Sequence, residues 1–259
     1  MTRFVPILAF VVVSSCAPSA SQLRKTLENN PDILVSAIQK HPTEFMAAFQ
    51  NASAEIEREA ANQAAGQEKA RMEEEYKNPK EPLITPGRAV RNKSGVITIV
   101  EYSDFQCPYC QRGFGTVEEV RRKYGNKIRF VLKHLPLDFH GMAMPAAKRF
   151  EAIARQSDEK AYAFHDEVFA NQERLVAEGE KFLDATAEKV GANVAKMKKD
   201  MESQDVRKTI QADMDEARKF GFSGTPGFIV GGVSLRGAYP AVRFEEIIDR
   251  RLKEQGTSD

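Results

Sequence analysis

The chain has 259 residues, and its 38 lysines and arginines almost balance its 37 aspartates and glutamates. This near-neutral charge excludes the strongly basic surface that a nucleic-acid-binding protein needs, so no nucleic acid is expected as a partner. Hydrophobic residues make up 42% of the chain, which is ordinary for a globular protein with a buried core. The length allows one large domain or one domain with an extension.

The first 20 residues have the pattern of a secretory signal peptide. One arginine precedes an apolar run over residues 4–13, which is too short to span a bilayer as a helix, and small residues follow it. The ending VSSC resembles the lipobox of bacterial lipoproteins and makes Cys16 a candidate lipid anchor. Ordinary cleavage, for example after Ala20, would instead remove Cys16. Both alternatives place the mature chain in the periplasm or cell envelope, and the first makes it a membrane-anchored lipoprotein.

The segment 21–77 is expected to be a helical extension. Apolar residues recur in it at helical spacing, and Pro31 and Pro42 stand where proline suits the first turn of a helix. Such helices have too little apolar surface to form a core alone, so they need a partner. We favour self-association through residues 21–76, which makes the protein a homo-oligomer. Packing against the main domain and a solvated spacer are the alternatives.

The segment 78–259 is expected to be the main domain, an α/β unit entered through a proline-rich linker or docking segment over 77–90. Its predicted elements are a strand over 96–105, a helix over 108–124, a second strand over 127–137, helices over about 141–220 with breaks near Gly179 and Gly191, two short strands over 227–237 joined at Gly231-Gly232, and a helix over 241–256. This order predicts a sheet whose two halves are separated by a helical insertion.

Two cysteines in the motif DFQCPYC, Cys107 and Cys110, point most clearly to chemistry. A zinc site normally needs a second pair of ligands, and the mature domain has no other cysteine and no histidines at ligand spacing, so no metal is expected. A structural disulfide here would close over only two residues and would constrain the unfolded chain little. The pair is therefore interpreted as redox-active.

The position of Cys107 supports a redox function. It falls between a predicted strand and a predicted helix, where helix amides and the helix dipole stabilise a thiolate and lower the thiol pKa. Cys110 lies one turn further on, where it can resolve a mixed disulfide. Pro108 suits the first helical turn. Tyr109 tunes the site without adding a cation, so a moderately oxidising site is expected.

A second motif, GTPGF, contains Thr225 and Pro226 directly before a predicted apolar strand. A Thr-Pro bond at such a place is a candidate cis peptide bond. Because proline has no N–H group, Pro226 can lie beside the sulfurs without donating to them, or leave a strand edge open to a substrate peptide.

Together, DFQCPYC, KHLPL and GTPGFIVGG resemble the DsbA-like thiol:disulfide oxidoreductases of the bacterial envelope, over about residues 80–255. The resemblance implies a thioredoxin fold with an inserted helical domain, Cys107 as nucleophile, Cys110 as resolving thiol and Pro226 as a cis residue opposite them. Thr225 would modulate the reactivity of the site, and no cofactor is implied.

Glu101, six residues before the first cysteine, matches an acidic residue that is buried below the active site in many relatives. The resemblance implies that its charge opposes the Cys107 thiolate or that its carboxyl relays protons to Cys110. A surface carboxylate at a strand edge is the alternative. His134, at the end of the second predicted strand, is interpreted as a structural histidine.

The resemblance implies disulfide formation or isomerisation in exported proteins that carry thiols or disulfides, with a membrane redox partner that resets the cysteine pair. The helical extension is similar to those of relatives that dimerise or trimerise and act partly as isomerases. Three alternatives stay open. They are a disulfide reductase, a glutathione-dependent reductase of the glutaredoxin type, which shares CPYC, and a non-enzymatic lipoprotein or scaffold that uses the domain as a binding module.

Overall fold

The computed structural model describes residues 19–256, which form two compact units, one up to Gln67 and one from Glu68. The expected signal peptide and the candidate anchor Cys16 lie outside the described residues, apart from Ser19 and Ala20. Within residues 19–256, none of the helices is long and apolar enough to cross a membrane.

The first unit is helical, as the sequence predicted. It consists of α1 (Ala20–Asn29), α2 (Pro31–Lys40) and the first part of α3 (Pro42–Lys77). Prolines begin α2 and α3, where the missing N–H group costs no helical hydrogen bond. No residue of α1 or α2 is buried, and Phe49 and Ile56 on α3 are 59 and 68% exposed. The described part of this unit therefore has apolar side chains but no core of its own.

The second unit begins inside α3. Met72 and Glu75 on its last turns are buried, and the Glu75 carboxylate accepts hydrogen bonds from the backbone N–H of Ser234 at 2.7 Å and from its hydroxyl at 2.9 Å. Arg250 pairs with Glu73 at 2.7 Å. The unit boundary therefore lies earlier than the expected junction between residues 77 and 78, because these contacts join the end of α3 to the main unit.

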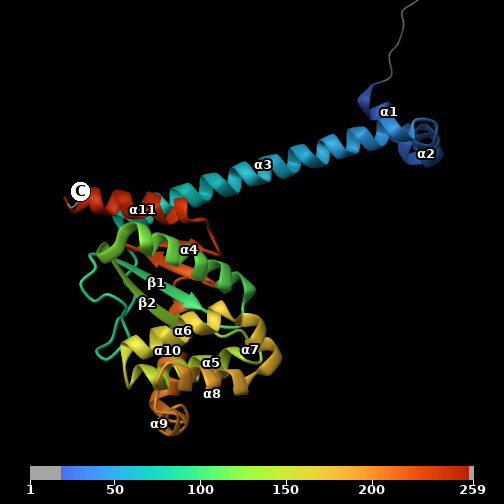
Figure 1. The fold of residues 1–259 in the computed structure, drawn as a ribbon. Coiled ribbons are helices and arrows are strands. Elements are labelled where there is room, and N and C mark those ends of the chain that lie inside the picture. The colour runs from blue at the N-terminus through green and yellow to red at the C-terminus, as the bar shows by residue number, and fades with distance from the viewer. Residues whose placement is uncertain (1–18, 257–259) are drawn as a thin grey trace, which may run out of the picture. The chain divides into compact units, whose positions relative to one another are not determined.

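The second unit is built on a four-stranded sheet with the strand order β2-β1-β3-β4 (Figure 1). The strands are β1 (Ile97–Ser103), β2 (Ile128–His134), β3 (Gly227–Val230) and β4 (Val233–Arg236), each within its predicted limits. β1 is parallel to β2 and antiparallel to β3, so it is an internal strand whose residue Glu101 lies between Leu132 and Phe228.

Helices cover both faces of the sheet. Successive side chains of β1 point to opposite faces. Ile99 joins the core formed with α4 (Pro108–Tyr124) and α11 (Ala241–Glu254), whereas Val100 joins the smaller core beneath α10 (Gln204–Lys219). A short 3-10 turn, η1 (Gly125–Lys127), connects α4 to β2. This layering fixes α4, and with it the cysteine pair, on one face of the sheet.

The helical insertion between β2 and β3 is present as predicted. It contains α5 (Ala143–Ala154), α6 (Asp158–Ala170), α7 (Gln172–Glu178), α8 (Glu180–Lys189), α9 (Val194–Asp200) and α10. The predicted breaks are confirmed, since Gly179 (φ 58°) separates α7 from α8 and Gly191 (φ 72°) follows α8. Side chains of Ser157, Asn193 and Ser203 cap the amino ends of α6, α9 and α10, which explains why these helices begin where they do.

The predicted hairpin turn is also confirmed. Gly231 and Gly232 have φ angles of 52° and 88°, and a two-residue turn with positive φ at both positions favours glycine. The backbone N–H of Lys80 donates to the carbonyl of Gly232 at 2.9 Å, and that of Leu83 donates to Glu216 of α10 at 2.7 Å. The proline-rich segment 77–90 is therefore a docked segment, held at the β3–β4 turn and at α10.

Candidate redox site

Cys107 and Cys110 lie at the amino end of α4, where the sequence placed them. Cys107 is the N-cap residue, with an extended backbone (φ −74°, ψ 123°), and Pro108 takes the first helical position. Both cysteines are free thiols, and only 4% of Cys107 and none of Cys110 is exposed. Tyr109 between them is 55% exposed, and the guanidinium of Arg112 lies 4.4 Å from its ring centroid. Tyr109 itself carries no charge, but its ring contacts the guanidinium of Arg112, which is a cation.

The two thiols have opposite acidities. The pKa of Cys107 is lowered to about 5, chiefly because the Cys110 thiol donates a hydrogen bond to its sulfur, and further by Thr225 and by the backbone amides of Cys110 and Tyr109, against an opposing effect of burial. Burial raises the pKa of Cys110 well above its usual range, and its hydrogen bond to Cys107 and the charge of Glu101 add to this. At neutral pH, Cys107 is the thiolate and Cys110 the thiol.

The loop before β3 faces Cys107. Its Thr225–Pro226 peptide bond is cis, and the Cys107 sulfur lies 3.6 Å from the Thr225 carbonyl oxygen. The Thr225 hydroxyl is buried and has no hydrogen-bond partner among the described residues. A methyl group added to Gly113 of α4 would lie 3.3 Å from Cγ of Pro226, so this loop packs directly on the helix that carries the cysteines.

Glu101 is fully buried on the face of β1 that α4 covers, so the alternative of a surface carboxylate at a strand edge is wrong. Its Oε1 accepts a hydrogen bond of 2.6 Å from the Ser103 hydroxyl, and its Oε2 has no partner within residues 19–256. Burial raises the pKa of Glu101 to about 7, and the Ser103 hydrogen bond opposes this shift. The carboxyl therefore changes protonation near neutral pH.

The side chains that hold the loop between β1 and α4 are not among those predicted from the sequence. The Asp104 carboxylate accepts hydrogen bonds from the backbone N–H groups of Gln106 (2.8 Å) and Leu137 (2.9 Å), and it contacts Nδ1 of His140 at 2.8 Å. Aspartate two residues before the donor is a readable turn signal. Gln172 of α7, which donates to two carbonyls of the same loop, has no such local signal.

His134 does not contact the thiols. Its Nε2 lies 2.9 Å from Glu151, and together with Asp213 these side chains place three potential metal-binding atoms within 4.8 Å of one another. The guanidinium of Arg88 lies 2.6 Å from Asp213 and 3.4 Å from Glu151. Since Arg88 already supplies the positive charge that the two carboxylates need, the cluster fits a buried ionic network and not a metal site.

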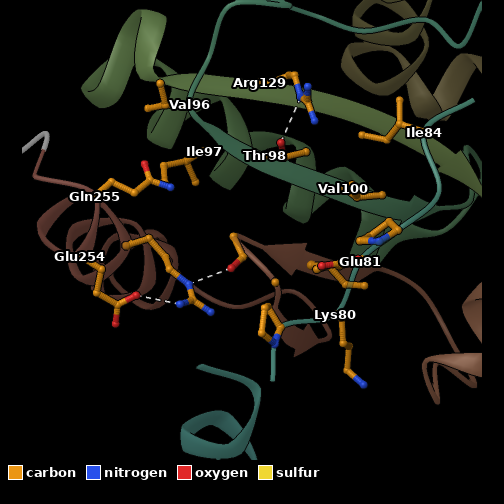
Figure 2. A pocket seen from close by; sticks show the side chains of 16 residues that line it. Lys80, Glu81, Ile84, Val96, Ile97, Thr98, Val100, Arg129, Glu254 and Gln255 are labelled. Carbon is orange, nitrogen blue, oxygen red and sulfur yellow. Dashed lines mark hydrogen bonds and ion pairs between the residues drawn. The ribbon is translucent and has the colours of Figure 1, made fainter. Parts of the chain in front are cut away.

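A cavity of about 470 Å³ lies elsewhere in the second unit (Figure 2). Ile97 and Thr98 at the start of β1, the segment around Lys80 and the end of α11 line it, and Arg129 donates to the Thr98 hydroxyl at 3.0 Å. Cys107 follows the opposite end of β1. The cavity is therefore not part of the thiol site.

Comparison with known proteins gives a family for most of the second unit. The family described as Thioredoxin matches residues 87–250. Among curated proteins, the Na(+)/H(+) antiporter NhaA of Herminiimonas arsenicoxydans is 33% identical over 163 residues, which are 63% of this chain and 25% of that protein. The antiporter NhaA 3 of Salinispora tropica is 34% identical over 144 residues, or 55% of this chain and 21% of that protein. The chain thus spans at most a quarter of the length of these two relatives.

Solved structures share the fold. A thioredoxin-like oxidoreductase from Silicibacter pomeroyi DSS-3 aligns with a TM-score of 0.57 and 28% identity, covering 65% of this chain and 94% of that one. The thiol-disulfide exchange protein alpha-DsbA2 from Wolbachia pipientis aligns with a TM-score of 0.59 and 15% identity, covering 74% and 98%. A linker-deletion variant of Proteus mirabilis ScsC aligns with a TM-score of 0.56 and 21% identity, covering 93% and 100%. The last two show likeness of fold alone.

Proposed function

Because this chain belongs to the thioredoxin family, we propose that it is a protein thiol:disulfide oxidoreductase that forms or isomerises disulfides in exported proteins. The observation that carries the proposal is the asymmetry of the cysteine pair. The pKa of Cys107 is about 5, whereas that of Cys110 is well above its usual range. A disulfide that only crosslinks the chain does not require its two thiols to differ in pKa, whereas disulfide exchange does benefit from such a difference.

In the oxidising direction, the reaction begins with a Cys107–Cys110 disulfide. A substrate thiolate attacks Sγ of Cys107, the bond between the two cysteines breaks, and Cys110 leaves as a thiolate that takes up a proton. A second substrate thiolate then attacks the substrate sulfur of the mixed disulfide. The substrate disulfide forms, Cys107 leaves as a thiolate, and two electrons have passed from substrate to the pair. The low pKa of Cys107 makes it a good leaving group in this last step.

Isomerisation starts from the reduced pair. The Cys107 thiolate attacks a substrate disulfide, a mixed disulfide forms, and the released substrate thiolate attacks another disulfide of the same substrate. The thiolate freed from that second disulfide then attacks the substrate sulfur of the mixed disulfide, so a new substrate disulfide forms and Cys107 leaves as a thiolate. If no substrate thiolate releases the mixed disulfide, Cys110 attacks the Cys107 sulfur, the Cys107–Cys110 disulfide forms and the substrate leaves as a thiolate. The Cys110 thiol must lose a proton before this attack. Glu101, with a pKa near 7 and an unpartnered oxygen among the described residues, is the group that we assign to accept this proton.

Thr225 and Pro226 are assigned to the substrate side of the site. The Thr225 carbonyl faces the Cys107 sulfur, and its unpartnered hydroxyl is suited to donate to the thiolate. Pro226 is the last residue of the loop before β3 and brings no N–H group to the sulfurs. Tyr109 is assigned to the exposed surface beside the cysteine pair. Pro108 is assigned to the start of α4, where it takes the first helical position.

The reduction potential of the pair tests the direction of electron flow. Equilibration in glutathione buffers, followed by thiol trapping and mass spectrometry, should give a value near the range of about −120 to −180 mV found for DsbA and protein disulfide isomerase. A value near that of thioredoxin, about −270 mV, would instead support a reductase. Cys110→Ser should accumulate mixed disulfides with a thiol-containing client, whereas Cys107→Ser should accumulate none. Equal trapping by both variants would contradict the assigned roles.

We place the protein in the periplasm or cell envelope, on the strength of the signal-peptide pattern at its amino end. Two-electron oxidation of clients leaves the cysteine pair reduced, so a membrane redox partner must reset it. Whether Cys16 carries lipid is tested by mass spectrometry of the mature protein from a bacterial envelope fraction. A lipid-modified Cys16 supports an anchored lipoprotein, and a mature chain that begins after Ala20 contradicts it.

We also propose that the chain self-associates through its first unit. The support is the exposed apolar side chains of α3, where Phe45, Phe49 and Ile56 follow one another at helical spacing. Light scattering of the full mature chain should give an oligomer, and Phe49→Asp should shift it towards the monomer. Val242→Asp, at an apolar side chain of similar exposure on α11, is the control. A monomeric wild-type chain would refute the proposal.

A further inference from the structure

The helical insertion contacts the redox loop through buried polar side chains. Gln172 is the first residue of α7 and is only 6% exposed. Its Nε2 donates hydrogen bonds of 2.9 Å to the carbonyl of Phe105 and of 2.9 Å to the carbonyl of Cys107. One amide group from the insertion therefore binds two peptide units on the amino side of α4.

These two carbonyls are not equivalent. The Cys107 carbonyl also accepts the first hydrogen bonds of α4, from the backbone N–H groups of Cys110 at 3.0 Å and Gln111 at 3.2 Å. For the Phe105 carbonyl, Gln172 is the donor that the described residues provide. Because a buried carbonyl without a donor is unfavourable, this hydrogen bond favours the observed conformation of the loop.

Two other glutamines, Gln106 in the same loop and Gln111 in the first turns of α4, also contact the insertion. The side-chain oxygen of Gln106 accepts from the backbone N–H of Met142 at 2.6 Å, at the start of α5, and Gln111 donates to the carbonyl of Phe169 in α6 at 3.0 Å. Of these three side-chain amides, that of Gln172 is the one that binds the Cys107 carbonyl. The contacts thus tie the loop and the first turn of α4 to three helices of the insertion.

We propose that Gln172 is a positioning residue that fixes the peptide unit of Cys107 and so holds its sulfur over the first amides of α4. The proposal rests on the proposed thiol chemistry. The amides of Tyr109 and Cys110 at the start of α4 help to lower the pKa of Cys107, and they can act on its sulfur only while Cys107 keeps the extended N-cap conformation. The insertion is therefore a support for the nucleophile as well as a cover for the sheet.

The test uses Gln172→Met in the full chain, since methionine has nearly the same length and no amide donors. The pH dependence of Cys107 alkylation, followed by mass spectrometry, should shift its midpoint upward by about 0.5 unit or more, which is a threefold or greater loss of thiolate at pH values below the midpoint. Gln156→Met is the control, because the Gln156 amide also binds backbone groups, donating to the Asn193 carbonyl at 3.2 Å and accepting from its N–H group at 2.8 Å, and both of these hydrogen bonds lie within the insertion.

Both variants should be less stable than the wild type, but only Gln172→Met should move the alkylation midpoint. If Gln172→Met does not fold, Gln172→Asn replaces it, because its shorter side chain cannot span both carbonyls. An unchanged midpoint in the folded Gln172 variant, or an equal shift in the Gln156 variant, would overturn the proposal. The two proposals fail separately. A wild-type protein that exchanges no disulfide with any client would refute the proposed function, whereas the shift in the Cys107 alkylation midpoint, which needs no client, would still test the role of Gln172.

Discussion

Replacing Glu101 by glutamine should stabilise the protein at neutral and alkaline pH but not in acid. Glu101 is fully buried, pairs with no cation among the described residues, and accepts one hydrogen bond from Ser103. Glutamine has the same shape and keeps an oxygen that can accept from Ser103. The substitution therefore removes the ionisation of the side chain and little else.

The magnitude follows from the pKa of Glu101, which is about 7 in the folded protein against an ordinary value of 4.5. Because the folded state prefers the protonated carboxyl, this contribution to stability is fully present below pH 4.5 and is lost as the pH rises through 7. A difference of this size corresponds to about 3 kcal/mol at 1.36 kcal/mol per pH unit. The stability difference between Glu101→Gln and wild type should grow by this amount between pH 4 and pH 8.

Urea unfolding of the reduced proteins, in steps from pH 4 to pH 8, measures this difference directly. The curve of unfolding free energy against pH should fall for wild type relative to Glu101→Gln, with most of the change between pH 4.5 and 7. Parallel curves for the two proteins would show that the carboxyl titrates normally and would refute the reasoning. The variant should also resolve mixed disulfides more slowly above pH 7, because Cys110 loses its proton acceptor.

Three further perturbations test other parts of the structure. The alkylation rate of Cys107 in the wild type should rise with pH through about 5 and then level off, and a midpoint near 9 would contradict the assigned acidity. Arg88→Met should lower the unfolding free energy by about 3–5 kcal/mol, since two buried carboxylates lose the guanidinium that they share, and a neutral effect in urea unfolding would argue against the ionic network. Gly113→Ala puts a methyl group 3.1 Å from the ring of Phe228 and 3.3 Å from Pro226. This substitution should lower the unfolding free energy by about 1–3 kcal/mol and slow disulfide exchange. Unchanged exchange kinetics would show that the loop before β3 can move away from α4 without an effect on the reaction.

Local signals in the sequence were sufficient for much of the fold. The turn at Gly231 and Gly232, the breaks at Gly179 and Gly191 and the prolines that begin α2 and α3 all act through the backbone of one or two residues. Such preferences are readable without knowing what lies next to them in space. The position of the cysteine pair at the start of a helix was readable for the same reason.

Contacts between distant segments could not be read in this way. The boundary at Glu68 depends on Glu75 meeting Ser234, and the charge-rich, alanine-rich end of α3 looks the same on either side of it. Gln172 is 65 residues from Cys107, and an isolated glutamine at the start of a short helix has no distinctive pattern. The sheet register decides which side chains meet, and register is a property of the assembled strands.

By itself, the sequence determined the chemistry of this protein: two cysteines at a helix start, with a Thr-Pro loop placed to approach them. The tertiary structure decided how that chemistry is tuned. It buried Glu101 on an internal strand, where the lack of solvent raises its pKa, and it brought Gln172 onto the carbonyl of Cys107. The physical reason is that reactivity resides in the residue type and its local backbone, whereas acidity and positioning depend on burial and on partners that only folding supplies.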